Sequence, residues 1–207
     1  MSGTAVTDTS GNEHSGVLKG GPIWTTGMRG GALTFDGQDD FVDLGDPQDL
    51  PSGKAVCSLC AWAKTDTVAA GWRWIVAYGT GNQGQAMAIG ANGSTLLGGG
   101  FADNLQLSSF WNPGIWHHIC LIYDGTTAGL YADGRQVASG LKTWNLVLNR
   151  AHIGRQVNDA AEFWDGSVDD VRIYRRALPP SDIQAIIDGK PVPDYDNITV
   201  SAVDDGL

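Results

Sequence analysis

The chain has 207 residues, a length that suits one large all-β domain, and its formal net charge is −10. Aspartate supplies almost all of the negative charge, with 21 Asp against two Glu, while Lys and Arg together number 13. Such a field repels nucleic acids and anionic membranes, so we expect neither as a partner, and divalent cations or neutral glycans fit better. No apolar run approaches the length of about 18 residues that spans a bilayer, so no membrane insertion is predicted.

Short apolar runs separated by glycine turns dominate the chain. Many of the 29 glycines follow Asp or Asn, as in Asp36-Gly37 and Asp124-Gly125, and such pairs tolerate the positive φ of hairpin turns. In chain order, the pattern predicts strands over residues 31–36, 40–45, 55–64, 73–79, 85–90, 95–100, 104–109, 116–124, 128–138, 150–154 and 163–174. The predicted fold class is all-β.

One short helix is expected, over residues 179–189. Two prolines suit its start, Ser181 or Asp182 places an acceptor or a negative charge in the first turn, and Gly189 supplies the stop. Three isoleucines share one face: Ile183, Ile186 and Ile187. The helix should therefore pack against the strands.

Four segments carry motifs in a characteristic order. They are residues 31–44 (GALTFDGQDDFVDL), 116–125 (WHHICLIYDG), 130–135 (LYADGR) and 163–178 (FWDGSVDDVRIYRRAL). Each resembles a motif of the laminin G-like, or concanavalin A-like, family, whose members include lectins, glucanases and pentraxin relatives. The resemblance implies a two-sheet antiparallel jelly-roll sandwich with one short C-terminal helix.

The resemblance covers about Asp8 to Gly189, so we expect a jelly-roll domain over residues 1–189 and an extended tail, extra strand or linker over residues 190–207. The apolar first strand that the family places before residues 3–12 is missing, which would expose a sheet edge. Residues 197–203 alternate polar and apolar side chains at strand spacing. They should either fill that position, within the chain or by strand exchange with a neighbour, or form a linker.

Two aspartate-rich turns carry the sharpest chemistry, with Asp36, Asp39 and Asp40 in one and Asp165, Asp169 and Asp170 in the other. If the two strands pair as the family implies, the crowded carboxylates need solvent or a cation. Calcium takes six to eight oxygen ligands, and many laminin G-like domains bind it, so the resemblance implies a structural Ca²⁺ at Asp36, Asp39, Asp169 and Asp170. Alternatively, the carboxylates accept hydrogen bonds from turn amides, and Asp169 faces inward as a buried acceptor.

Eight tryptophans suggest carbohydrate binding, because aromatic faces stack on the apolar faces of sugars. Several of them occupy positions where the family has core aromatics. Trp72, Trp111 and Trp144 instead lie in or beside polar loops, where binding residues concentrate. Each is expected either to line a ligand surface or to belong to the core.

Cysteines and catalytic motifs point away from an enzyme. Cys57, Cys60 and Cys120 are an odd set without a second pair for a zinc site, so we expect small buried hydrophobes. The two glutamates, Glu13 and Glu162, do not form the paired-carboxylate pattern of glucanases. Neither a nucleophile elbow nor a phosphate-binding glycine loop is present. We therefore assign no catalytic residues.

Two functions remain. The first is a calcium-stabilised, lectin-like module of a larger surface or secreted protein that recognises a glycan. The second is a structural or adhesive module, displayed on a cell or virion surface, that binds another protein and no sugar. Both place the chain outside the cell or at its surface, although the N-terminus lacks the basic start and apolar core of a signal peptide. The fold alone does not decide between them.

Overall fold

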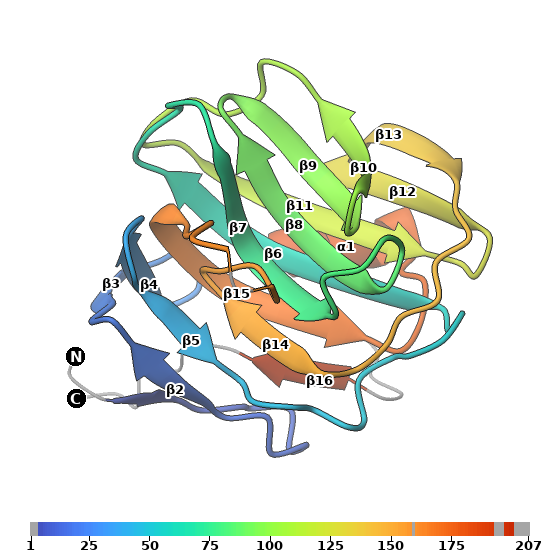
Figure 1. The fold of residues 1–207 in the computed structure, drawn as a ribbon, viewed down its shortest axis with the longest axis horizontal. Helices are drawn as coiled ribbons and strands as arrows, with labels where there is room; N and C mark the ends of the chain where they lie inside the picture. The colour runs from blue at the N-terminus through green and yellow to red at the C-terminus, as the bar shows by residue number, and fades with distance from the viewer. Residues whose placement is uncertain (1–3, 159, 193–196, 201–207) are drawn as a thin grey trace.

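Two antiparallel sheets form a β-sandwich in the computed structural model, which describes residues 4–158, 160–192 and 197–200 (Figure 1). Sheet A has the strand order β1-β2-β5-β14-β7-β8-β9-β10, and sheet B the order β13-β12-β11-β6-β15-β4-β3, with β16 beside β15. Strands far apart in sequence are neighbours, as in β4 and β15, which lie side by side. The predicted all-β jelly-roll sandwich is confirmed.

Most predicted strands are present, with small shifts at their ends. Sheet A contains β1 (Ala5–Val6), β2 (Gly16–Lys19), β5 (Phe41–Asp43), β7 (Trp72–Gly79), β8 (Ala86–Asn92), β9 (Thr95–Gly100), β10 (Asp103–Leu107) and β14 (Arg150–Ile153). Sheet B contains β3 (Ile23–Thr26), β4 (Gly31–Asp36), β6 (Cys57–Thr65), β11 (Trp116–Tyr123), β12 (Thr127–Ala132), β13 (Arg135–Leu141), β15 (Asp165–Tyr174) and β16 (Asn197–Val200).

The N-terminal strands and one hairpin differ from the prediction. β1, β2 and β3 were not predicted, because each has at most four residues and a mixed burial pattern. β12 and β13 were predicted as one strand over residues 128–138. The chain turns between them at Asp133 and Gly134, which have φ of +49° and +80°. This tight Asp-Gly turn makes the pair a hairpin.

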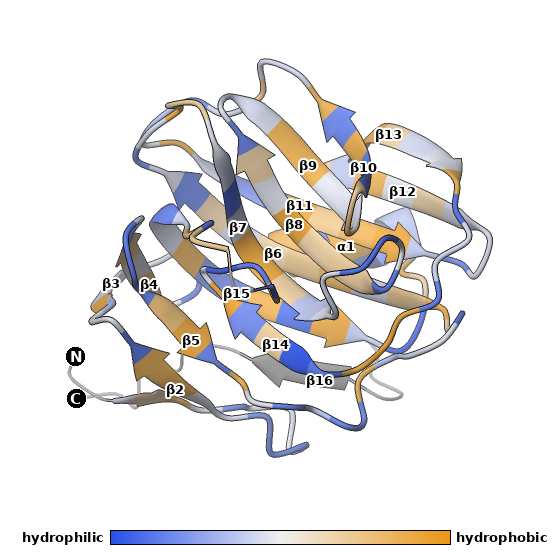
Figure 2. Cartoon of the chain, in the orientation of Figure 1, coloured by the Kyte–Doolittle hydropathy of each residue, from blue (hydrophilic) through white to orange (hydrophobic). Residues whose placement is uncertain are grey.

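The core lies between the sheets. Alternate residues of sheet B, such as Leu59, Ala61 and Leu121, face alternate residues of sheet A, such as Val76 and Ile89, and all five are fully buried. Figure 2 shows the apolar residues concentrated along the central strands, with hydrophilic residues in the connecting loops. This alternation leaves the outer face of each sheet to be covered by other elements or by solvent.

The outer face of sheet B carries the predicted helix, α1 (Pro180–Ile187). Asp182 in its first turn pairs with Arg176 at 2.7 Å, and Gly189 follows the helix with φ of +70°. Ile183 and Ile186 are fully buried on sheet B. None of the helices among the described residues has the length and hydropathy needed to cross a membrane.

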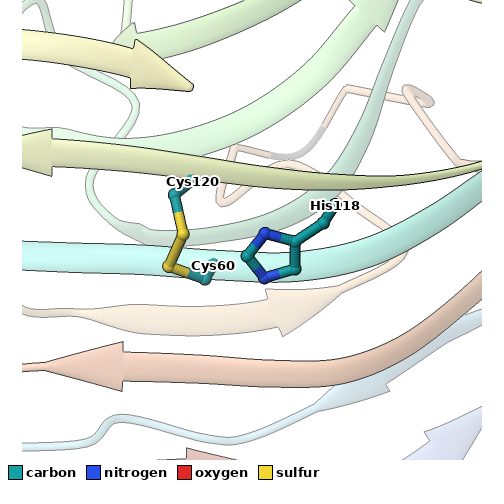
Figure 3. A group of neighbouring side chains, drawn as sticks. All are labelled: Cys60, His118 and Cys120. Atoms are coloured by element: carbon teal, nitrogen blue, oxygen red, sulfur yellow. A yellow bond between two sulfur atoms is a disulfide. The ribbon is translucent and has the colours of Figure 1, made fainter. Parts of the chain in front are cut away.

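Beneath α1, Cys60 of β6 and Cys120 of β11 form a disulfide (Figure 3). All three cysteines are buried, as expected, but the bond between Cys60 and Cys120 was not predicted. They lie directly opposite each other in the β6–β11 register, a relation that their separation of 60 residues does not reveal. Cys57 stays a free, buried thiol, as expected.

The C-terminal tail supplies a strand. β16 pairs antiparallel with Val171–Tyr174 of β15, within the same chain. β4 pairs only with the other half of β15, Asp165–Val168, so β16 occupies the edge that β4 leaves open. Residues 201–203, which were also expected to extend this strand, lie outside the described residues.

Candidate functional site

The turn between β4 and β5 gathers three carboxylates. Carboxylate oxygens of Asp36, Asp39 and Asp40 all lie within 4.8 Å of one another. Asp36 Oδ1 accepts the backbone N–H of Gln38 at 2.8 Å, and Asp40 Oδ2 accepts that of Asp36 at 3.0 Å. Each of these two residues thus keeps one carboxylate oxygen that the turn does not use, while Asp39 keeps both. Three carboxylates that each offer a hard oxygen suit Ca²⁺, which would need further oxygens from backbone or water.

Negative charge accumulates around this turn. Asp165 lies directly opposite Asp36 in the β4–β15 ladder, so the predicted pairing of the two aspartate-rich strands is confirmed. Burial raises the pKa of Asp40, and the charges of Asp36 and Asp39 raise it further. Burial also raises the pKa of Asp165, as do Asp66 and Asp36. A bound cation would relieve this repulsion.

Asp169 lies away from the turn. It is four residues beyond Asp165 along β15, which corresponds to about 13 Å in a strand. Its Oδ2 accepts the N–H of Arg29 at 2.7 Å, in the turn between β3 and β4, and a Cβ at Gly27 would collide with the same carboxylate. Burial raises the pKa of Asp169. Asp169 is therefore the buried hydrogen-bond acceptor of the alternative interpretation.

Asp170 also has a partner elsewhere. Its Oδ1 accepts the Nε–H of Arg172 at 2.7 Å, and the residue is only 4% exposed. Neither Asp169 nor Asp170 belongs to the carboxylate group of the β4–β5 turn. The four-aspartate calcium site is corrected accordingly, because β15 extends its later aspartates away from the turn.

Two of the three candidate tryptophans are core residues. Trp144 is fully buried and donates its indole N–H to Asp103 at 3.0 Å. Trp111 is 2% exposed and packs edge-on against Trp164 with ring centroids 5.3 Å apart. Although polar residues flank both positions in sequence, the loops fold back over the ends of the sandwich. Neither ring is available to a ligand, so their assignment to a binding surface is wrong.

Trp72 is the candidate that reaches solvent. It begins β7 and is 44% exposed. Its ring stacks on Trp74, with centroids 6.1 Å apart and planes inclined by 13°. Trp74 is buried on the outer face of sheet A and donates its indole N–H to Glu162 at 2.7 Å. The exposed Trp72 ring thus stacks on a buried Trp74 ring whose position is fixed by a hydrogen bond.

The same face continues from Glu162 into a second aromatic group. Phe163 and Phe41 have ring centroids 6.3 Å apart, and the guanidinium of Arg155 lies 5.2 Å and 5.1 Å from the two ring centres. All three side chains are partly exposed. Together, Trp72, Trp74, Glu162, Phe163, Arg155 and Phe41 form a continuous run of contacts, which we call the aromatic strip.

Most of the aromatic strip escaped the sequence analysis. Phe41 and Phe163 belong to the family motifs, but their alternation with apolar neighbours does not distinguish an outward ring from a core ring. Arg155 and Glu162 stand in a loop with no pattern of their own. The one signal in the sequence was that an aromatic residue lies next to each aspartate-rich turn, Phe41 in one case and Phe163 in the other.

The described residues offer no obvious catalytic pair. The carboxylate of Glu162 is engaged with Trp74. His117 Nδ1 lies 2.7 Å from Asp133, but Asp133 also accepts the backbone N–H of His118, and this ties the dyad to the β12–β13 turn. Burial lowers the pKa of His118 to about 3, with help from the charge of Arg172, so its imidazole stays neutral.

Comparison with known proteins agrees with this architecture. The family model described as the concanavalin A-like lectin/glucanases superfamily matches residues 36–184. An alpha-L-arabinofuranosidase of Bifidobacterium longum subsp. longum is 27% identical over 70 residues, which are 32% of this chain. The match spans only 7% of that enzyme's length.

Two solved structures share the fold. Domain 4 of AbnA, a GH43 extracellular arabinanase from Geobacillus stearothermophilus solved with arabinotriose, is 21% identical with a TM-score of 0.69. The match covers 87% of this chain and 92% of that domain. The CBM40 of the Ruminococcus gnavus IT-sialidase, bound to alpha2,3 sialyllactose, is 14% identical with a TM-score of 0.54, over 64% and 82% of the two chains. At these identities the likeness concerns the fold.

Proposed function

The chain belongs to the concanavalin A-like lectin/glucanases superfamily, and from that premise we propose that it is a non-catalytic module that binds a glycan through the aromatic strip. The domain type resembles carbohydrate-binding modules, including the arabinanase domain solved with arabinotriose. Domains of this kind also occur within glycoside hydrolases, so the module would serve a larger surface or secreted protein.

Trp72 carries this proposal. The Trp72 side chain is 44% exposed, so a large part of its apolar ring is available to a ligand. Stacking on Trp74, which Glu162 holds by a hydrogen bond, fixes the plane of the Trp72 ring before a ligand arrives. A rigid, exposed aromatic plane is suited to the apolar face of a sugar ring, and pre-organisation reduces the entropy lost on binding.

A titration with neutral oligosaccharides tests the proposal. The panel should include arabino-oligosaccharides, and tryptophan fluorescence should change on binding because Trp72 is at the contact. Trp72→Ala should lower the affinity at least tenfold with little loss of stability. Leu141→Ala is a matched control, since Leu141 is an exposed apolar residue on β13 of the other sheet. If no glycan binds and Trp72→Ala changes nothing, the adhesive, protein-binding module becomes the better hypothesis.

Calcium is a separate part of the proposed function. We propose that Ca²⁺ binds the β4–β5 turn through Asp36, Asp39 and Asp40, where the carboxylates crowd together. Ligand linkage would then stabilise the fold by about 2.7 kcal/mol at a hundred times the dissociation constant. Thermal melts in chelator and in millimolar calcium should differ, and Asp39→Asn should shrink the difference. Asp46→Asn, an exposed aspartate nearby, is the control. Identical melts would mean that these carboxylates only accept hydrogen bonds from turn amides and bind no calcium.

We also propose an extracellular or surface location. The Cys60–Cys120 disulfide is consistent with it, because such bonds persist in oxidising compartments. Thiol titration of the natively isolated protein under denaturing conditions should detect one free cysteine, Cys57. Three free thiols would contradict this location.

A further inference from the structure

Arg155 contacts two aromatic rings on the outer face of sheet A. Its guanidinium lies 5.1 Å and 5.2 Å from the centres of the Phe41 and Phe163 rings, which are themselves 6.3 Å apart. No hydrogen bond or ion pair joins this guanidinium to any described residue, and its Nε is buried without a partner. By contrast, Arg172 and Arg176 each pair with an aspartate at 2.7 Å. The chain contains 21 Asp, yet none of the described ones compensates Arg155.

A second unpaired cation lies beside it. Lys19 stands directly opposite Phe41 in the β2–β5 ladder, and the two side chains share the outer face of sheet A. Lys19 is exposed and has no ion pair with a described residue. Neither nearby carboxylate pairs with these cations, since Asp43 lies 3.9 Å from His152 and Glu162 accepts the Trp74 N–H. Two cationic side chains at this end of the aromatic strip are thus left without an ion-pair partner among the described residues.

The geometry suits a single carboxylate. Contact with the two rings limits the movement of the guanidinium, and its unpaired N–H groups can donate two parallel hydrogen bonds to a carboxylate. A polyanion is disfavoured by the net charge of −10. One carboxylate within a neutral chain meets little of that repulsion, because salt screens charges beyond about 8 Å.

We propose that Arg155, assisted by Lys19, binds the carboxylate of a uronic-acid-type residue in the glycan that stacks on Trp72. This inference rests on the proposed glycan-binding function and adds the ligand class to it. Glu162 bonds Trp74 and precedes Phe163 in the chain, and Phe163 contacts Arg155. The aromatic strip thus connects Trp72, where a sugar would stack, to Arg155, where a carboxylate would bind. One oligosaccharide lying along the strip would occupy both.

The test compares matched probes by calorimetric titration. Each probe pair is a neutral oligosaccharide and its counterpart in which one hydroxymethyl group is replaced by a carboxylate. The wild type should bind the acidic member at least tenfold more tightly. Arg155→Gln should remove that preference, so that the affinities for the two members of a pair become equal within about twofold. Arg155→Lys should keep part of it, because charge remains but the planar fork is lost. Arg135→Gln, an exposed arginine on β13, should change neither affinity.

The outcomes separate this inference from the function beneath it. If the wild type binds both probes equally, or if Arg155→Gln weakens both equally, the carboxylate subsite is overturned while glycan binding through Trp72 stands. A merely structural Arg155 would lower the melting temperature without changing the ratio of the two affinities. If neither member of any pair binds, both the subsite and the proposed function are overturned.

Discussion

The outer faces of the two sheets differ in how far other elements of the chain cover them. On sheet B, α1 and the β3–β4 turn cover the face, and Asp169 accepts the Arg29 N–H beneath them. On sheet A, the aromatic strip stays partly open, with Trp72 exposed and the Arg155 guanidinium unpaired. The outer face of sheet B is closed by the chain itself, whereas that of sheet A leaves the Trp72 ring and the Arg155 guanidinium partly exposed to solvent.

This difference separates stability from binding. Buried groups with fixed partners stabilise the sandwich, and their removal should lower the free energy of unfolding. Groups that lack partners in the free protein contribute little to folding, so their removal should change ligand affinity instead. The following experiments test that division, beginning with the largest expected effect.

Tryptophan substitutions should show the contrast most strongly. Trp144→Ala should destabilise the protein by about 3–5 kcal/mol, because it removes a fully buried ring from the core. Trp72→Ala should change stability by less than about 1 kcal/mol and act on glycan affinity. Urea denaturation of both variants measures this. Equal destabilisation would mean that Trp72 is a structural residue and that the two faces do not differ.

Removing the disulfide should weaken the closed face and spare the open one. The double variant Cys60→Ala, Cys120→Ala should lose about 2–5 kcal/mol, because the crosslink constrains the unfolded chain. Glycan affinity of the folded fraction should not change. Chemical denaturation and titration at low temperature measure the two quantities. A variant as stable as the wild type would show that the covered face does not depend on the bond.

Acid should act through the closed face as well. His118 has a pKa of about 3 in the folded protein, below its ordinary 6.5, so between these values only the unfolded chain takes up the proton. Stability should therefore fall as pH falls below about 6.5, by about 2–3 kcal/mol at pH 4.5. His118→Gln should flatten this slope, whereas His14→Gln should keep it. If stability depends on pH equally in the two variants, His118 does not cause the loss of stability in acid.

Deleting residues 193–207 should have the smallest effect on stability. The deletion removes β16 and its pairing with Val171–Tyr174, which should cost about 1–2 kcal/mol from a few backbone hydrogen bonds. Size-exclusion chromatography of the full chain and the deletion tests the further prediction that the tail can exchange between neighbours. An unchanged melting temperature and oligomeric state would show that the tail strand contributes nothing.

Local patterns determined much of this protein. Glycine turns between apolar runs specify short antiparallel strands, and the proline start, isoleucine face and Gly189 stop specify α1. The Asp36 turn was predictable because its carboxylates lie within five residues of one another. The alternation in residues 197–200 likewise predicted β16. In each case the residues that decide the structure are neighbours in the chain.

Only the tertiary structure decided which groups meet across the sheets. Cys60 and Cys120 are partners because β6 and β11 align in register, and Asp169 lies away from the β4–β5 turn because β15 runs past that turn. Trp111 and Trp144, like Trp72, lie in or beside polar loops in the sequence, but packing between the sheets buries the first two. Arg155 became a candidate only when Phe41, more than a hundred residues away, lay beside it. Burial and pairing of this kind depend on contacts between distant segments, which sequence spacing does not encode.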